Sequence, residues 1–229
     1  MRARIQGALR RLERMVSFWL PHKQGVVYWE ERAARLGRRA VIDVGHGEEE
    51  FEDVTRMQEE QLFPRLGALL TGAEATLLDF GCGPGRFAPG LAELSGAHVV
   101  AVDPIAALLE LAPAHPHVEY RRLAQRRIPL DDGVADVVWI CLVLGGITQA
   151  AELAETLEEI DRVLGAEGLL FLVENTEQAR DGPHWVQRPV DAYRELLDFV
   201  DLEHLGEYRD LDAVVSILAG RRKGAGRRG

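Results

Sequence analysis

The sequence predicts an α/β protein built on a doubly wound sheet of seven strands. After Thr76, short β-branched runs alternate with amphipathic stretches, and a glycine-rich turn follows the first of these runs. With 229 residues, of which 47% are hydrophobic, the chain is long enough for one full-sized core. Because strands that alternate with helices are joined by crossovers, we expect a mostly parallel sheet with an antiparallel last strand.

Residues 1–25 predict a basic amphipathic helix. Apolar residues recur at helical spacing from Ile5 to Trp19, five arginines precede Met15, and Pro21 ends the pattern. Such a helix either contacts an anionic membrane surface through residues 1–20 or packs on the domain or on a second subunit. The sequence leaves these alternatives and the oligomeric state open.

Residues 26–70 predict a helical segment that serves as a lid or contacts a substrate. One short periodic pattern runs from Tyr28 to Leu36, and a second apolar stripe begins at Phe51 and is expected to break near Pro64. The acidic run at 48–53 is expected to form a solvated helix start.

Residues 71–223 are expected to form the main domain, followed by a basic tail at 224–229. Buried strands are predicted at 76–80, 98–103, 117–120, 135–141 and 168–174. The runs at 201–208 and 213–222 have no long helix between them and predict a closing antiparallel pair.

The charge and composition exclude several classes of protein. The net charge is −10 although both ends are basic, so the body of the chain is strongly acidic and a nucleic-acid substrate is disfavoured. Cys82 and Cys141 form neither a disulfide framework nor a metal motif, and no metal site is predicted. The apolar run from Val137 to Ile147 is too short to span a membrane, and no secretory signal is evident. We therefore expect a cytoplasmic protein that acts on small molecules.

The turn after the first predicted strand indicates an adenosine-type ligand. Gly81, Gly83 and Gly85 allow a tight turn and close approach of a ligand, and Asp103 ends the next strand, where a carboxylate can bind both ribose hydroxyls. Arg86 stands where a dinucleotide fingerprint needs glycine or alanine, and no phosphate-binding loop is present. Asp79 would repel a pyrophosphate but can accept hydrogen bonds from an ammonium group, so the ligand should carry an amine.

From about Leu77 to Asn175 the sequence resembles the class I S-adenosylmethionine-dependent methyltransferases. Asp79 with the three glycines is similar to their first motif, Asp103 to their ribose-binding acid, residues 127–147 to the segment around their fourth strand, and residues 162–175 to their fifth strand. The resemblance implies a Rossmann-like fold and S-adenosyl-L-methionine as cofactor. The cofactor-binding residues that it implies are Asp79, Gly81, Cys82, Gly83, Gly85, Asp103, Pro104, Ala124, Gln125, Cys141 and Leu142.

The sequence departs from the family at two places. Ala124 stands where an acidic residue often contacts the adenine, and Gly145 with Gly146 replaces a histidine that is common after the fourth strand. Backbone groups near Ala124 and Gln125 are therefore expected to bind the adenine, and a base is expected elsewhere.

The family places acceptor contacts in three stretches of this chain, at 22–63, 142–150 and 175–190. His184 is the first candidate for a base and Glu174 the second, since either can take a proton from an acceptor. The candidate substrate residues are Tyr28, Trp29, Arg32 and Trp185, and Arg32 or Arg86 is expected near the methionine carboxylate.

These features predict methyl transfer to a small or medium-sized acceptor, with oxygen slightly favoured as the methylated atom. A sugar, a lipid precursor or a secondary metabolite fits this class. Two alternatives remain open: a non-catalytic module that binds S-adenosylmethionine and regulates a partner, and, ranked third, an NAD-dependent dehydrogenase.

Overall fold

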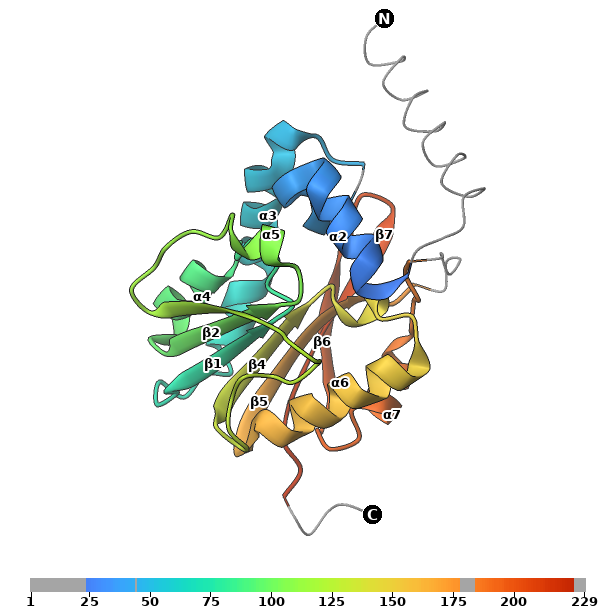
Figure 1. The fold of residues 1–229 in the computed structure, drawn as a ribbon. Coiled ribbons are helices and arrows are strands. Elements are labelled where there is room, and N and C mark those ends of the chain that lie inside the picture. The colour runs from blue at the N-terminus through green and yellow to red at the C-terminus, as the bar shows by residue number, and fades with distance from the viewer. Residues whose placement is uncertain (1–23, 44, 178–183, 225–229) are drawn as a thin grey trace, which may run out of the picture.

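The protein forms one mixed sheet of seven strands with helices on both faces (Figure 1). We describe a computed structural model at residues 24–43, 45–177 and 184–224. The strand order is β3-β2-β1-β4-β5-β7-β6, and β7 runs antiparallel to both of its neighbours while the first five strands pair in parallel. The strands are β1 (Thr76–Phe80), β2 (His98–Asp103), β3 (Val118–Arg122), β4 (Ala135–Cys141), β5 (Leu164–Asn175), β6 (Glu203–Asp210) and β7 (Ala213–Arg221).

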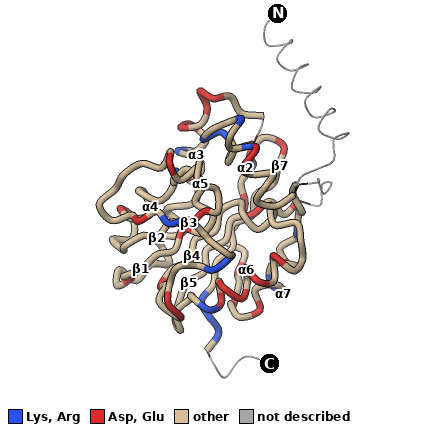
Figure 2. The backbone as a smooth tube through the Cα atoms, viewed as in Figure 1, with Lys and Arg blue, Asp and Glu red and all other residues tan. Residues whose placement is uncertain are grey.

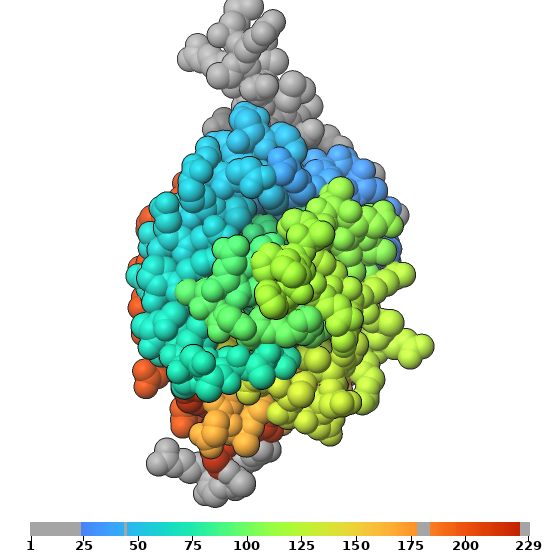
Figure 3. Space-filling view, turned by 90° about the vertical axis from the view of Figure 1, so that its left-hand side faces the viewer, coloured from blue at the N-terminus to red at the C-terminus, as the bar shows by residue number. Residues whose placement is uncertain are grey.

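The helices form two covering layers and a cap. Residues of α6 and α7 join one apolar cluster with the sheet, and residues of α3 and α4 join a second cluster with it. Helix α2 with η1 packs against α5 at the carboxyl ends of the parallel strands, and in Figure 3 the blue and cyan residues of this N-terminal part close one end of the molecule. The α-helices are α2 (Gly25–Leu36), α3 (Phe51–Gly67), α4 (Ala88–Ser95), α5 (Ala106–Leu109), α6 (Ala150–Val163) and α7 (Val190–Leu196), and the 3-10 helices are η1 (Gly37–Val41), η2 (Glu48–Glu50) and η3 (Leu144–Gly146).

The central strands are buried on both faces, which explains their continuous apolar sequences. From Val137 to Ile140 every side chain of β4 is fully buried, with successive residues facing opposite clusters. Trp139 stacks on Phe171 of β5 with ring centroids 5.1 Å apart. This packing fixes the two strands that carry the loops of the site described below.

The predicted architecture is confirmed, including the doubly wound order and the antiparallel strand β7, whereas one helix boundary is wrong. Helix α3 continues through Pro64 to Gly67 instead of breaking there. Proline has no backbone N–H and so removes one hydrogen bond of the helix. Pro64 lies in the last turn, and the helix ends three residues later. The predicted amphipathic helix lies almost wholly outside the described residues, and so does most of the 224–229 tail.

Charged residues of both signs are spread over the described backbone (Figure 2). The basic residues at 221–223 lead into the C-terminus, and two of them bind the domain itself: Arg221 donates to the carbonyl of Leu69, and Arg222 pairs with Asp161 at 2.6 Å. Within the described ranges no helix is long and apolar enough to cross a bilayer.

Candidate functional site

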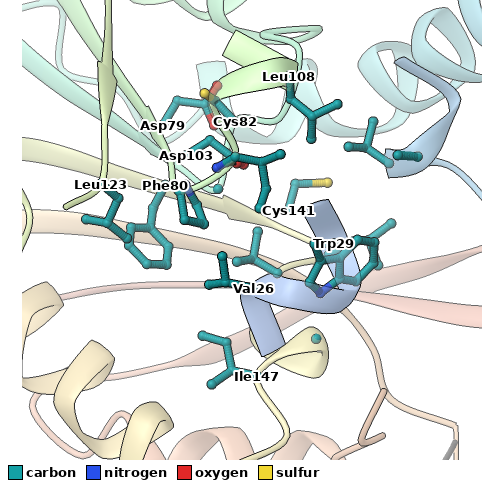
Figure 4. A pocket seen from close by; sticks show the side chains of 18 of the residues that line it. Val26, Trp29, Asp79, Phe80, Cys82, Asp103, Leu108, Leu123, Cys141 and Ile147 are labelled. Atoms are coloured by element: carbon teal, nitrogen blue, oxygen red, sulfur yellow. Dashed lines mark hydrogen bonds between the residues drawn. The ribbon is translucent and has the colours of Figure 1, made fainter. Parts of the chain in front are cut away.

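A cavity of about 800 Å³ lies across the carboxyl ends of the parallel strands, beneath α2. Figure 4 shows Val26 and Trp29 of α2 facing the cavity, with Asp79 and Asp103 on its other side. A crevice at this end of an open α/β sheet is where such folds bind ligands. Most of the predicted cofactor residues line it, namely Asp79, Gly81, Cys82, Asp103, Pro104, Ala124, Gln125, Cys141 and Leu142.

The glycine turn after β1 is shaped by its own surroundings. Gly81, Gly83 and Gly85 have φ values of +75°, +56° and +71°, a region that side chains rarely adopt. A Cβ on Gly81 would lie 2.5 Å from a methyl of Val143, and one on Gly85 would lie 2.6 Å from the Tyr120 ring. Gly83 and Gly85 do not line the cavity, so their part is to set the path of the turn.

Asp79 carries a buried carboxylate with an unused oxygen. The side chain is 3% exposed, and its Oδ2 has no hydrogen-bond partner within the described part of the chain. Burial raises the pKa of Asp79 to about 7, with Arg86 opposing and Asp103 adding to the shift. A buried acceptor without a partner is costly, so Asp79 is suited to a donor supplied by a ligand.

Asp103, at the end of β2, is held in place by the backbone. Its Oδ2 accepts from the amide of Gly83 at 2.9 Å and its Oδ1 from the amide of Ile105 at 2.8 Å. Burial raises the pKa of Asp103 to about 6, against these two hydrogen bonds. Because each carboxylate oxygen has two lone pairs, both oxygens can still accept from hydroxyl groups in the cavity.

These features fit the cofactor that the sequence implies. The unpartnered oxygen of Asp79 suits an ammonium group, and Asp103 keeps acceptor capacity for a ribose. The turn from Ala124 to Arg127 also borders the cavity, with φ of +51° at Gln125 and +59° at Arg126. This turn brings backbone groups to the wall at which the adenine is expected.

The loop after β4 is held from two sides. Glu174, which is fully buried, accepts from the amides of Val143, Leu144 and Gly145 at 2.8, 2.6 and 3.3 Å. Arg188 donates to the carbonyl of Leu144 at 2.9 Å and to that of Ile147 at 3.1 Å. Leu142 begins this loop with a φ of +58° and lines the cavity.

Neither predicted base lines the cavity. Glu174 is turned to the backbone of the loop instead of an acceptor, and burial raises its pKa to about 7. His184 stacks on Tyr28 with ring centroids 3.6 Å apart, and Tyr28 is also outside the cavity lining. The structure thus gives Glu174 a role in holding the loop and places His184 beside the cap.

Three of the four predicted substrate residues reach the cavity: Trp29, Arg32 and Trp185. The two indole rings meet edge to face with centroids 6.5 Å apart. Trp29 packs over Gly146, where a Cβ would come within 3.1 Å of the indole, and Trp185 packs over Gly145, where a Cβ would overlap the indole ring. The absence of side chains at Gly145 and Gly146 therefore makes room for the two tryptophans.

Sequence reasoning missed a buried pair at the far side of the cavity. Asp210, at the end of β6, lines the cavity and accepts from His46 Nε2 at 2.7 Å. Gln58 of α3 bonds to Asp210 at 3.5 Å and also accepts from Arg86. No local signal reveals the pair, because His46 and Asp210 are 164 residues apart.

The two cysteines behave as packing residues. Burial raises the pKa of Cys141 to about 12 and that of Cys82 well above its usual range, so neither thiol is activated as a nucleophile. In the described ranges no three His, Cys, Asp or Glu side chains are grouped to hold a metal ion.

Comparison with known proteins agrees with this geometry. Residues 78–172 match the family described as "Methyltransferase domain". A malonyl-[acyl-carrier protein] O-methyltransferase of Yersinia pestis is 30% identical over 162 residues, which are 69% of this chain and 58% of that protein. An N-demethylindolmycin N-methyltransferase of Streptomyces griseus is 34% identical over 104 residues, 44% of each protein. The chain thus spans less than two thirds of these relatives.

Solved structures share the fold. A SAM-dependent methyltransferase of Methanosarcina mazei superposes with a TM-score of 0.60 at 17% identity, over 71% of this chain and 99% of that one. At such low identity the superposition shows only that the fold is shared.

Proposed function

We propose that the chain is a class I methyltransferase that transfers a methyl group from S-adenosyl-L-methionine to a small or medium-sized acceptor, and the family match of residues 78–172 and the shared fold support this. One observation supports the proposal most strongly: the buried Oδ2 of Asp79, which has no partner among the described residues, lies at the cavity beside the glycine turn. A diphosphate would be repelled there, whereas an ammonium group would satisfy that oxygen.

Each wall of the cavity fits a different part of the cofactor. Asp79 would hold the amino group of the methionine portion and Asp103 the ribose hydroxyls, while the turn at Ala124 and Gln125 would border the adenine. Arg86 is close enough to Asp79 to lower its pKa and lines the cavity, which suits the methionine carboxylate.

The reaction requires little covalent chemistry from the protein itself. When bound, S-adenosylmethionine would supply a methyl group on a positively charged sulfur, with the neutral thioether as the leaving group and the acceptor's proton passing to solvent. The chain's contribution is to align the acceptor and to exclude water. Cap residues Val26 and Trp29, together with Val143 and Trp185, supply apolar walls for this purpose.

The methylated atom and the class of acceptor are also part of the proposal. The sequence slightly favours oxygen, and a sugar, a lipid precursor or a secondary metabolite is our proposed class. The relatives named above include both an O- and an N-methyltransferase.

Incubation with methyl-labelled cofactor and fractionated cell extracts tests the proposal. We expect label in one or a few fractions, and no label with Asp79→Asn protein. The exposed Asp53→Asn is the matched control and should label as wild type does. A wild-type protein that binds the cofactor but labels no fraction would instead be the non-catalytic module.

A further inference from the structure

Asp210 is a second buried carboxylate in the cavity, and the cofactor assignment does not use it. The residue is 7% exposed and stands at the end of β6, the edge strand of the sheet opposite β3. His46 donates to its Oδ1 at 2.7 Å, and Gln58 reaches its Oδ2 at 3.5 Å. These contacts fix the carboxylate but use only part of its acceptor capacity.

Asn175, at the carboxyl end of β5, adds a second oxygen to the cavity lining. Its side-chain oxygen is buried and has no hydrogen-bond partner among the described residues. Asn175 pairs with Val215 of β7, and Val215 pairs on its other side with Tyr208, two residues before Asp210. Val215 and Ala213, the latter paired with Asp210, also line the cavity.

Two tryptophans also line the cavity. Trp185 packs on Gly145. The amide of Gly145 donates to Glu174, which precedes Asn175 in the chain. Trp29 meets Trp185 edge to face and lines the same cavity. Aromatic faces beside oxygen acceptors are the surroundings that stabilise an organic cation.

We propose that Asp210 and Asn175, with Trp29 and Trp185 as walls, form an acceptor subsite that binds a protonated amine of the methyl acceptor. The inference rests on the proposed function, because it assigns the part of the cavity that the cofactor leaves free. An ammonium group would make charge-assisted hydrogen bonds to Asp210, and Asn175 would accept from a second donor of the same acceptor molecule.

Other acceptor groups fit this subsite less well. A carboxylate would face Asp210 as a like charge. A neutral hydroxyl can donate to Asp210 but gains neither the charge-assisted bond nor the attraction of the tryptophan rings. The nearby cation Arg86 is already bound to Gln58 and packs over the Phe87 ring at 4.1 Å. Asp210 therefore keeps for a ligand the acceptor capacity that His46 and Gln58 leave unused.

Binding of a matched pair of probes tests the proposal. The full-length protein is first titrated with S-adenosylhomocysteine, and the loaded protein is then titrated by calorimetry with 2-phenylethylamine and with 2-phenylethanol. We expect the amine to bind at least tenfold more tightly than the alcohol. Asp210→Asn should remove this preference, because the amide keeps an oxygen for His46 but loses the negative charge. Asp212→Asn, an exposed change in the same hairpin, should keep it.

The outcomes separate this inference from the proposed function. No heat with S-adenosylhomocysteine in the wild type would contradict the cofactor assignment itself. Heat with that compound, together with equal binding of amine and alcohol or no binding of either, would overturn the amine subsite. A preference that survives in Asp210→Asn would overturn the role of Asp210. Should that variant fail to fold, the wild-type comparison still decides whether an amine is preferred.

Discussion

At the scale of single residues, Asp79 is the buried carboxyl group on which the cofactor assignment depends most. One carboxylate oxygen is buried without a partner in the described ranges, and burial raises the pKa of the group to about 7. In the ligand-free protein, part of Asp79 is therefore protonated near neutral pH. An incoming ammonium group would lower its pKa and favour the ionised form. Much of the selectivity for an amine-bearing ligand should come from this one side chain.

The affinity for S-adenosylhomocysteine should consequently depend on pH. Below its pKa Asp79 is protonated and cannot pair with an ammonium group, so we expect affinity to rise as the pH increases through about 7 and then to level off. Asp103, whose pKa is raised to about 6, acts in the same direction at lower pH. Calorimetric titrations of the wild type and of Asp79→Asn measure the effect. A profile in the variant as steep as in the wild type would contradict it.

The glycine turn gives a second prediction at this scale. Gly85→Ala combines an unfavourable φ of +71° with a Cβ that would lie 2.6 Å from Tyr120. Gly133→Ala has a similar φ of +67° but no atom within 4 Å of the new Cβ, so it isolates the backbone strain. We expect Gly133→Ala to lower the free energy of unfolding by about 1 kcal/mol and Gly85→Ala by about 1–3 kcal/mol more. Urea denaturation measures both, and equal losses would show that Tyr120 moves aside without penalty.

At the scale of elements, the loop from Leu142 to Ile147 is the part of the site that the fold holds most firmly. Glu174 binds three of its amides and Arg188 two of its carbonyls, so β5 and the segment before α7 fix it between them. The loop in turn places Val143 against Gly81. The position of the cavity wall therefore depends on a residue that does not touch the cavity.

Glu174→Gln tests this positioning role. The amide keeps one oxygen acceptor but replaces the other with a donor, so the bond from the Gly145 amide is lost. We expect faster hydrogen exchange at residues 143–145, weaker binding of S-adenosylhomocysteine, and unchanged exchange in the core of β4. The exposed Glu158→Gln on α6 serves as control. Unchanged exchange at residues 143–145 would show that Glu174 does not hold the loop.

The sequence allowed the elements to be predicted where their signals are local. The strands from β1 to β5 follow from continuous apolar runs, and the ligand end follows from glycines and two aspartates at fixed spacing. The course of α3 past Pro64 was not predictable, because the sequence shows the lost hydrogen bond but not the contacts of Leu62 and Leu66, which are fully buried against the sheet. Tertiary packing overrode the local preference there.

At the scale of the whole molecule, the site joins segments that lie far apart in the chain. The pairing of His46 with Asp210 ties the residues before α3 to the β6–β7 hairpin, and Gln58 with Arg86 ties α3 to the glycine turn. These pairs depend on how the cap and the hairpin meet, so no pattern in the sequence could reveal them. For the same reason Asp210 was not among the candidate residues that the sequence indicated.

The buried carboxyl groups should make the stability of the ligand-free protein depend on pH. Asp79, Asp103 and Glu174 all have a raised pKa in the folded state, so the folded protein binds more protons than the unfolded chain from about pH 4 up to about pH 7. The free energy of unfolding should therefore fall as the pH rises through this window. Urea denaturation of the wild type and of Asp79→Asn across this pH window isolates the contribution of Asp79. The free energy of unfolding should fall more in the wild type than in the variant. Identical slopes in the two proteins would contradict the assignment to Asp79.

The central claim is that the cavity binds a sulfonium nucleoside and not a dinucleotide. Calorimetric titration with S-adenosylhomocysteine and, separately, with NADH tests it most directly. We predict saturable heat with S-adenosylhomocysteine, weakened at least tenfold in Asp103→Ala, which corresponds to about 1.4 kcal/mol, and no heat with NADH. Saturable binding of NADH without any response to S-adenosylhomocysteine would contradict the account.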